Sequence, residues 1–369
     1  MRIVFVVNNY PPRVGGLENH VSSLARHLAA AGHEVVVHTM SDAGTRRTTA
    51  TEQGVEVHRW PEAFQIGGLL GFPTLGAARG LWRAITRSGA DLVSTHTRFF
   101  PLTWLAVAAA RAARLPVVHT EHGSGHVASP SPVIKVGSRV VDETFGRLSL
   151  RGADAVLGVS EEVVAFVRAL SGVGGHVFYN AIEAPEVAGT PPHLRRHLVF
   201  VGRIVPGKGW EDFLKVVASV DDDVTAEVLG DGQDLSELRR HAAALGLGGR
   251  LAIRGRVPMA EVFTALAGAI LVNPTRLSEG FQTTLLEALA VGARVVTYPV
   301  PGTSLLAAQG APITVVDRST NALLAGVRSR LADAPEAVWG AEEIAAWTWS
   351  ARSREYVELV SGVRSRRAR

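Results

Sequence analysis

Two cations stand in a glycine-rich turn of the sequence, Gly202-Arg203-Ile204-Val205-Pro206-Gly207-Lys208-Gly209. Arginine binds an anion through a planar fork of donors and lysine through a point charge, so the pair could clamp a diphosphate. Lysine occurs only at positions 135, 208 and 215, which favours a functional Lys208. The turn is not a P-loop, because no Ser or Thr follows the lysine. A solvated basic turn is the alternative interpretation.

Two carboxylates accompany the start of a predicted helix in Glu279-Gly280-Phe281-Gln282-Thr283-Thr284-Leu285-Leu286-Glu287. We expect Glu279 in a loop beside the unpaired N–H groups of the helix, and Glu287 inside its first turns. Two separated carboxylates could accept hydrogen bonds from two sets of ligand hydroxyls. The alternative is that such glutamates only cap the helix or complement its dipole.

A third turn, Pro11-Pro12-Arg13-Val14-Gly15-Gly16, ends in two glycines before a predicted helix. Glycine lets a ligand approach the backbone, and a helix N-terminus offers free N–H groups to an anion. The pattern G-x-G-x-x-G is missing, so a dinucleotide site is not indicated. The alternative is a strand-to-helix turn that merely needs glycine.

Three histidines, His119, His122 and His126, lie close together in the sequence and raise the possibility of zinc. The glycines between them break the helix that would bring them to one face, so we do not predict a metal site. We predict instead that His122, at the end of a strand, serves as a proton donor or ligand contact. His96 is a second candidate of this kind. A solvated loop histidine is the alternative for each.

These turns must be positioned by the elements that precede them, which are short apolar strands alternating with helical patterns. The first half of the chain has predicted strands at 3–7, 34–38, 92–95, 116–120 and 155–159, with a helix at about 16–31. The second half has predicted strands at 198–202, 225–229, 251–254, 270–273 and 294–297, with helices around 210–220, 234–245, 259–266 and 283–291. This alternation predicts an α/β fold with parallel, doubly wound sheets.

A segment with three prolines, Pro185, Pro191 and Pro192, separates the two halves. We predict an N-terminal Rossmann-like domain at 1–182, a linker at 183–197 and a C-terminal Rossmann-like domain at 198–346. The final segment, 347–369, is predicted to be a helix with a loose basic tail from Ser361 onward. In an architecture of two Rossmann-like domains that face across a cleft, ligands bind at the carboxyl ends of the strands.

Composition narrows the function classes. The chain has 369 residues, 47% of them hydrophobic, no cysteine and a net charge of +4. A disordered chain, a disulfide scaffold and a thiolate metal site are excluded. No apolar run reaches the roughly 20 residues of a membrane span, and no signal peptide is indicated, so we expect a cytoplasmic protein. A basic nucleic-acid-binding protein is a weak alternative, because the charge is nearly balanced and aromatic residues make up only 6%.

Taken together, these motifs resemble the GT-B glycosyltransferases of family 4, a retaining, nucleotide-sugar-dependent group. The resemblance spans nearly the whole chain. It rests on motifs in a fixed order: Gly15-Gly16-x-Glu18, Gly32-His33-Glu34-Val35, His122, Val159-Ser160, Asn180-x-Ile182, Gly202-Arg203 with Lys208-Gly209, Gly230-Asp231-Gly232, and Glu279-Gly280-Phe281 leading to Leu286-Glu287-Ala288.

The resemblance implies a role for each site residue. Arg203 and Lys208 would hold the donor diphosphate, Glu279 the donor sugar hydroxyls, and Glu287 the ribose. The resemblance implies that Arg256 and Val257 contact the base. The sugar or phosphate would be contacted by Gly280, Phe281, Gln282 and Thr283. Gly15 and Gly16 would approach the phosphates, and His122 would contact the transferred sugar.

The resemblance also implies front-face transfer with retention, no cofactor and no metal. The family usually has glycine where this chain has Gln282, and a glutamate where it has Leu305. In the family, a last helix crosses back to pack on the N-terminal domain. A nucleotide-sugar epimerase or a phosphorylase on the same fold is the main alternative function.

The acceptor is expected on the N-terminal half, where 60–82 and 126–150 are candidate walls, and it could be a small molecule or a lipid-linked sugar. Val133, Val136 and Val140 alternate with Lys135 and Arg139 in the second of these segments. Such a helix could lie against the inner face of an anionic membrane or pack on the core as an ordinary amphipathic helix.

Overall fold

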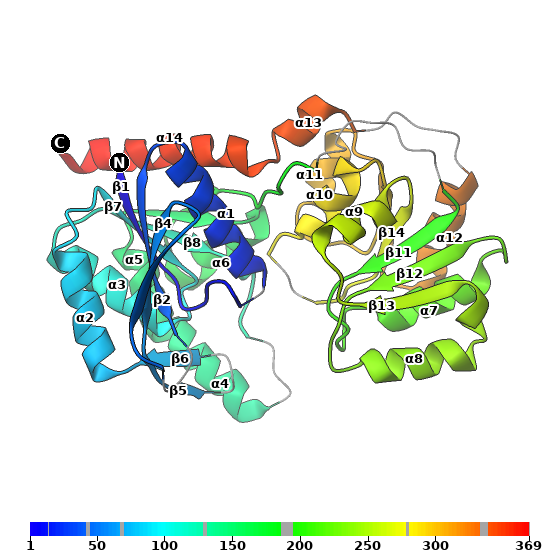
Figure 1. Ribbon diagram of the computed structural model, residues 1–369, viewed down its shortest axis with the longest axis horizontal. Coiled ribbons are helices and arrows are strands. Elements are labelled where there is room, and N and C mark those ends of the chain that lie inside the picture. The colour runs from blue at the N-terminus through cyan, green and yellow to red at the C-terminus, as the bar shows by residue number, and fades with distance from the viewer. Residues whose placement is uncertain are drawn as a thin grey trace. The chain divides into compact units, whose positions relative to one another are not determined.

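The protein is described from a computed structural model, which covers residues 1–13, 15–41, 45–66, 70–127, 131–185, 195–277, 280–332 and 339–368. It divides into two compact units (Figure 1). Unit 1 comprises Met1–Asn180 together with Trp349–Arg369, and unit 2 comprises Ala181–Thr348. Unit 1 is therefore made from both ends of the chain.

Unit 1 contains a sheet with the strand order β10-β9-β8-β7-β1-β2-β4-β3, in which only the edge pair β3–β4 is antiparallel. Its strands are β1 (Arg2–Val6), β2 (Glu34–Met40), β3 (Thr48–Glu52), β4 (Val55–Trp60), β7 (Leu92–His96), β8 (Val117–Glu121), β9 (Ala155–Gly158) and β10 (His176–Val177). The central strands are buried on both faces, which explains the apolar runs of β1 and β2, whereas β7 and β8 are apolar at their starts and polar at their carboxyl ends.

Helices and a separate hairpin complete unit 1. They are α1 (Gly16–Ala30), α2 (Leu75–Thr86), α3 (Pro101–Ala112), α4 (Pro132–Val141), a π-helical turn at Asp142–Gly146, α5 (Arg147–Gly152), α6 (Glu161–Ser171), α14 (Trp349–Ala368), and the antiparallel pair β5 (Glu62–Ile66) and β6 (Leu70–Pro73). Helix α1 buries Val21, Leu24 and Leu28 at helical spacing, so its sequence period determines the face that packs on the sheet.

Unit 2 contains a fully parallel sheet with the order β13-β12-β11-β14-β15-β16. Its strands are β11 (His197–Val201), β12 (Thr225–Leu229), β13 (Leu251–Gly255), β14 (Ile270–Asn273), β15 (Arg294–Thr297) and β16 (Ile313–Val315). Its helices are α7 (Trp210–Ser219), α8 (Leu235–Ala244), a 3₁₀ turn at Leu247–Gly249, α9 (Met259–Leu266), α10 (Thr283–Ala290), α11 (Thr303–Ala308), α12 (Thr320–Ala332) and α13 (Ala341–Ala345). Counted within the unit, this is the strand order 3-2-1-4-5-6 of a Rossmann fold.

The predicted α/β class with parallel sheets is confirmed, and the predicted strands agree with the structure to within one or two residues at each end. Sequence reasoning missed the pairs β3–β4 and β5–β6, because β3 (Thr-Thr-Ala-Thr-Glu) is polar and largely exposed and carries no core-facing alternation. Of the predicted linker, residues 186–194 lie outside the described residues, and His197 already belongs to β11.

The prediction that the chain is loose from Ser361 onward is wrong. Helix α14 continues to Ala368, Val363 is buried, and Arg364 forms an ion pair with Asp91 at 2.6 Å. Val363 provides the apolar anchor that the sequence reasoning did not recognise. Farther back in α14, the Tyr356 ring packs on Phe5 and Phe178, with ring centroids 6.2 and 5.7 Å apart. The last helix is therefore part of the core of unit 1.

Candidate active site

Three loops at the carboxyl ends of β11, β12 and β14 in unit 2 pack backbone against backbone. Gly209 has φ +88°, and a Cβ there would lie 2.1 Å from the carbonyl oxygen of Pro274. Gly230 has φ +153°, and its Cβ would lie 1.8 Å from the carbonyl oxygen of Gly202. Only glycine permits both the backbone angles and this proximity. The loops form one surface on either side of the switch point between β11 and β14, where open sheets bind ligands.

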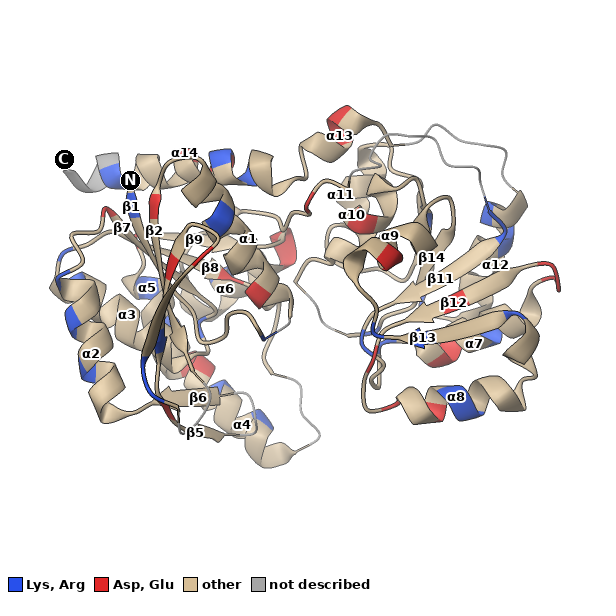
Figure 2. Ribbon diagram, viewed as in Figure 1, with Lys and Arg blue, Asp and Glu red and all other residues tan. Residues whose placement is uncertain are grey.

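The two predicted cations lie in the first of these loops. Arg203 is exposed and Lys208 is half-buried. The Lys208 stem lies over Gly202, where a Cβ would meet Cε at 2.7 Å. Figure 2 shows basic residues in the loops next to the β13 label. Because Gly202 has no side chain, the Lys208 side chain can lie along the turn.

Arg276 connects the first loop to the third. Its backbone N–H donates to the Gly207 carbonyl at 2.8 Å, and its guanidinium donates to Asp212 at 3.0 Å. Asp212 also accepts from Tyr298 at 2.9 Å and from Thr320 at 2.6 Å. Burial opposes ionisation of Asp212, but these hydrogen bonds and the arginine charge lower its pKa. This network fixes the loop that leads toward Glu279, which itself lies outside the described residues.

The predicted donor-binding segment 280–283 turns its large side chains into unit 2. Phe281 is buried and stacks on Trp347, with ring centroids 5.6 Å apart. Gln282 is buried, and its Oε1 accepts from Asn273 at 2.7 Å. The residue that departs from the family pattern is therefore held by the end of β14. What Gly280, Phe281 and Gln282 can offer a ligand is mainly backbone, immediately before the N-terminus of α10.

Glu287 lies one turn after Thr283 in α10. Burial raises the pKa of Glu287 to about 7, although a hydrogen bond from Thr283 opposes the shift. Glu287 is half-buried, and no cation partner for it is found among the described residues, so its carboxyl group is suited to accept hydrogen bonds from ligand hydroxyls. Arg256 and Val257 directly follow β13, two strands from β11, with Arg256 exposed and Val257 half-buried.

Gly15 and Gly16 begin α1 in unit 1, with Gly15 as the N-cap residue. A Cβ on Gly15 would meet Oε2 of Glu18 at 2.3 Å, whereas one on Gly16 would meet nothing within 4 Å. The carboxylate of Glu18 thus folds back on the first turn of the helix, where it complements the helix dipole.

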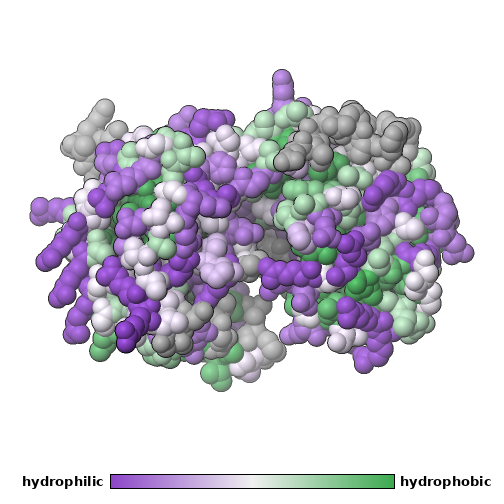
Figure 3. All heavy atoms as spheres, viewed as in Figure 1, coloured by the Kyte–Doolittle hydropathy of each residue, from purple (hydrophilic) through white to green (hydrophobic). Residues whose placement is uncertain are grey.

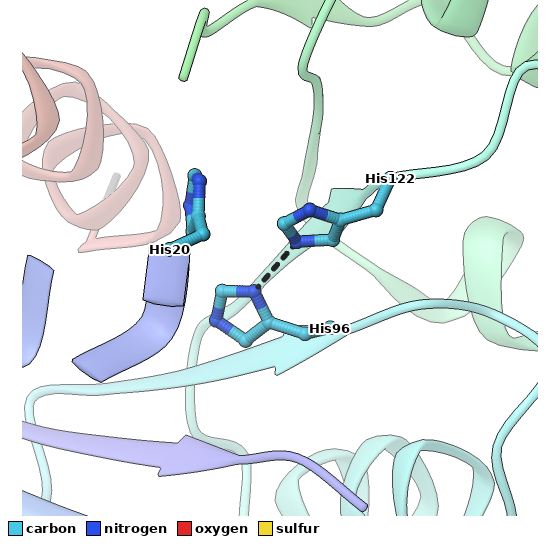
Figure 4. A group of neighbouring side chains, drawn as sticks. All are labelled: His20, His96 and His122. Atoms are coloured by element: carbon cyan, nitrogen blue, oxygen red, sulfur yellow. Dashed lines mark hydrogen bonds between the residues drawn. The ribbon is translucent and has the colours of Figure 1, made fainter. Parts of the chain in front are cut away.

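His122 lies beside two other histidines rather than beside its sequence neighbours (Figure 4). Nδ1 of His96, at the end of β7, is 3.2 Å from Nε2 of His122, and the ring of His20 lies 4.7 Å from that of His122. Burial lowers the pKa of His20 to about 4 and holds the pKa values of His96 and His122 well below the usual range, so the rings are neutral. Sequence reasoning missed His20; a histidine among the core-facing positions of an amphipathic helix was the available signal.

The other two histidines of the sequence cluster have partners of their own. His119 lies 3.0 Å from the Thr95 hydroxyl and 3.4 Å from Glu121, and His126 lies 2.6 Å from Asp142. The structure therefore does not bring His119, His122 and His126 together.

A buried ion cluster holds the loop that carries His122. Arg98 contacts Glu121 at 3.1 Å and Asp142 at 3.0 Å, and all three side chains are buried. Burial opposes ionisation of Glu121, but the charge of Arg98 and hydrogen bonds from neighbours lower its pKa. Glu121 also accepts the backbone N–H groups of His122 and Gly123, at 2.9 and 3.0 Å. Arg98 thus stabilises the start of the loop after β8.

Helix α4 exposes its apolar side chains. Val133, Val136 and Val140 are 81%, 64% and 57% exposed, although these valines would be buried in a helix packed on the core. Figure 3 shows apolar side chains at the surface where Figure 1 places α4. Lys135 and Arg139 on the same helix are exposed as well. Among the described residues, no helix is both long enough and apolar enough to cross a bilayer.

Two Rossmann-type sheets, with a cationic glycine-rich turn and a helix start at the switch point of the second, define the GT-B class of glycosyltransferase fold. Comparison with known proteins agrees. The family model described as Glycosyltransferase Family 4 matches residues 14–184, and the one described as Glycosyl transferases group 1 matches residues 195–333. The chain belongs to the family 4 type of GT-B glycosyltransferases, a nucleotide-sugar-dependent group, and is a glycosyltransferase.

Several glycosyltransferases are similar to this chain over most of its length, at low sequence identity. A glycogen synthase of Mycobacterium tuberculosis is 28% identical over 90% of this chain and 86% of its own length. A GDP-mannose-dependent phosphatidylinositol monomannoside mannosyltransferase of Mycolicibacterium smegmatis is 25% identical over 99% of this chain and 100% of its own. Anabaena HepE, solved in complex with UDP, has a TM-score of 0.73 and 19% identity over 98% of this chain and 100% of its own.

Proposed function

We propose that this enzyme transfers a sugar from a nucleoside-diphosphate sugar to an acceptor hydroxyl with retention of the anomeric configuration. The observation that carries the proposal is the assembly at one edge of the unit 2 sheet. Arg203 and Lys208 lie in a loop that is packed, through Gly209 and Arg276, against the loop leading to α10 and Glu287. Anabaena HepE, which has the same fold, was solved in complex with UDP and in complex with UDP-glucose, which supports a donor of this class.

We propose the role of each residue from the resemblance to the family and from the charge that the residue carries. Arg203 and Lys208 neutralise the diphosphate as its bond to the sugar breaks, which is where negative charge develops. Glu287 accepts from the ribose, Arg256 and Val257 contact the base, and the backbone before α10 approaches the sugar. From unit 1, Gly15 and Gly16 present helix N–H groups to the phosphates, and His122 contacts the transferred sugar. Glu279 binds the sugar hydroxyls.

Retention follows if transfer takes place on one face of the sugar. The bond between the anomeric carbon and the phosphate oxygen breaks, the acceptor oxygen bonds to the same face, and the leaving phosphate takes the acceptor proton. Two cations at the diphosphate replace the charge of a divalent metal, so we propose that turnover requires none. This step uses no covalent intermediate with the enzyme.

The exposed apolar face of α4, with Lys135 and Arg139 beside it, supports a peripheral contact with an anionic membrane and therefore a lipid-linked acceptor. The protein should sediment with vesicles that contain anionic lipid and less with neutral ones. Val136→Glu should abolish the difference, whereas Leu245→Glu, at an exposed apolar residue of unit 2, should not.

The function is tested in two steps. A thermal-shift screen of nucleoside diphosphates and their sugars identifies the donor, because a bound ligand stabilises the folded state. The anomeric proton coupling of the product, followed by NMR, then reports the configuration, with and without chelator. A retained anomer and unchanged turnover in chelator are expected. An inverted product, a donor isomerised without acceptor, or activity restored only by Mg²⁺ or Mn²⁺ would each overturn part of the proposal.

A further inference from the structure

Three imidazoles from separate elements of unit 1 converge at the carboxyl end of its sheet. His20 comes from α1, His96 from the end of β7, and His122 from the loop after β8. One ring nitrogen of each can be chosen such that all three lie within 4.8 Å of one another. Figure 4 shows the rings of His96 and His122 edge to edge, with His20 beside them.

One ring nitrogen of His20 has no hydrogen-bond partner among the described residues. Nδ1 of His20 lies 2.8 Å from Oδ1 of Asn180, and an amide oxygen can only accept, so Nδ1 carries the hydrogen. Nε2 therefore carries a lone pair. It is fully buried, and no hydrogen-bond partner for it is found among the described residues. A buried acceptor of this kind normally has a donor or an ion.

The other two nitrogens already have the spacing of ligands. Nδ1 of His96 and Nε2 of His122 are 3.2 Å apart. Two imidazoles bound to a tetrahedral zinc, at about 2.0–2.1 Å each, hold their nitrogens about 3.3 Å apart. His122 is the least buried of the three, so an ion can enter from its side.

Groups behind the rings orient them as they do in metal centres. Asn180 holds His20 through Nδ1, and the Ser94 hydroxyl lies 3.2 Å from Nε2 of His96. Metal-binding histidines usually make such a second hydrogen bond, which fixes the ring and its tautomer. Three neutral nitrogen ligands and no carboxylate suit Zn²⁺, Co²⁺ or Cu²⁺ and do not suit Mg²⁺ or Ca²⁺.

We propose that His20, His96 and His122 form a binding site for a transition-metal ion of the zinc type, with the fourth position left open. The ion would replace the hydrogen bond between His96 and His122 and take the lone pair of His20. Where His122 contacts the transferred sugar, which rests on the proposed function, the occupied site withdraws that imidazole. Zinc is then an inhibitor of an enzyme that needs no metal for turnover.

Binding is measured first, without turnover, on the metal-stripped full-length protein. Isothermal titration with ZnCl₂ should show one ion per chain, and CoCl₂ should give the visible d–d bands of a four-coordinate site. His20→Gln and His96→Gln should each weaken Zn²⁺ binding at least ~30-fold, because losing a ligand costs no less than the ~10–100-fold loss for a second-shell partner. His27→Gln, on the same helix as His20, is the matched control and should leave the affinity unchanged.

A measurement on the wild type covers the case in which a buried substitution prevents folding. Zn²⁺ should shift the ¹⁵N resonances of Nε2 of His20, Nδ1 of His96 and Nε2 of His122. Absence of stoichiometric binding, unaltered binding in both variants, or shifts confined to other histidines would overturn the site. Binding at this site without loss of turnover would leave the site standing and overturn the role of His122 in transfer.

Discussion

The loops at the carboxyl ends of the strands are held by different interactions in the two units. In unit 2, the loops meet through backbone, since Gly209 and Gly230 let main chains touch at distances that a Cβ would forbid, and the half-exposed pair of Arg276 with Asp212 supports one of them. In unit 1, the loop after β8 is held by buried charge, with Arg98 between Glu121 and Asp142. In unit 2, Arg203 remains exposed at these loops, whereas Arg98 of unit 1 is buried in its ion pairs.

This difference predicts which substitutions lower stability and which lower catalytic activity. A substitution in unit 1 that unpairs buried carboxylates should act on stability, because the uncompensated charge remains in a low-dielectric environment. A substitution of an unburied cation in unit 2 should act on catalysis with the fold intact. Four predictions test this distinction, from the largest expected effect to the smallest.

Arg98→Met should lower the free energy of unfolding by about 3–5 kcal/mol, because Glu121 and Asp142 then lie buried without their partner. Chemical denaturation measures the loss. Arg111→Met is the matched control, since its ion pair with Asp154 is exposed and should contribute roughly 0.2–1 kcal/mol. Equal losses in the two variants would remove the distinction between the units.

Lys208→Ala should reduce kcat/KM at least ~100-fold, the scale of a lost charge contact in the transition state. Its melting temperature should remain near that of the wild type. Lys215→Ala, an exposed lysine on α7, serves as the control with unchanged kinetics. A Lys208 variant within threefold of the wild type would show that this turn does not hold the diphosphate.

Glu287 should make the stability of unit 2 depend on pH. Because burial raises its pKa in the folded state to about 7, the folded protein binds the proton more tightly than the unfolded chain. The contribution of protonated Glu287 to the free energy of unfolding is present in full below the unfolded pKa near 4.5, and it is lost as the pH rises through 7. Between pH 4.5 and 8, the wild type should lose about 2 kcal/mol relative to Glu287→Gln, after allowance for partial exposure. Parallel curves for the two proteins would contradict the shift.

Deletion of residues 362–369 should lower the free energy of unfolding by about 1–2 kcal/mol, since it exposes the site of Val363 and removes the pair of Arg364 with Asp91. Thermal unfolding of the truncated chain checks this. A truncated chain as stable as the full one would mean that the end of α14 contributes nothing to unit 1.

Much of this architecture could be predicted, because most of the parallel strands contain a short run of apolar, often β-branched residues that ends at a turn signal. The segments 225–229, 270–273 and 294–297 were located to the residue for this reason. The convergence of His20 with His96 and His122 could not be predicted, since it depends on how α1 packs on the rest of unit 1. The same holds for Arg276, whose partners Asp212 and Tyr298 are distant in sequence. The site residues themselves remain predictions that the proposed variants test.

Helix α14 has a consequence for the synthesis of the protein. Unit 1 needs Trp349–Arg369, including the Tyr356 ring that packs on Phe5 and Phe178, yet the ribosome makes these residues only after the whole of unit 2. Domains generally fold as units while the chain emerges, N-terminal first. Here unit 2 is translated in full before the first unit can close its core. The N-terminal half therefore keeps apolar surface exposed until α14 has been synthesised, and a chain stalled before residue 349 would be a target for chaperones and proteases.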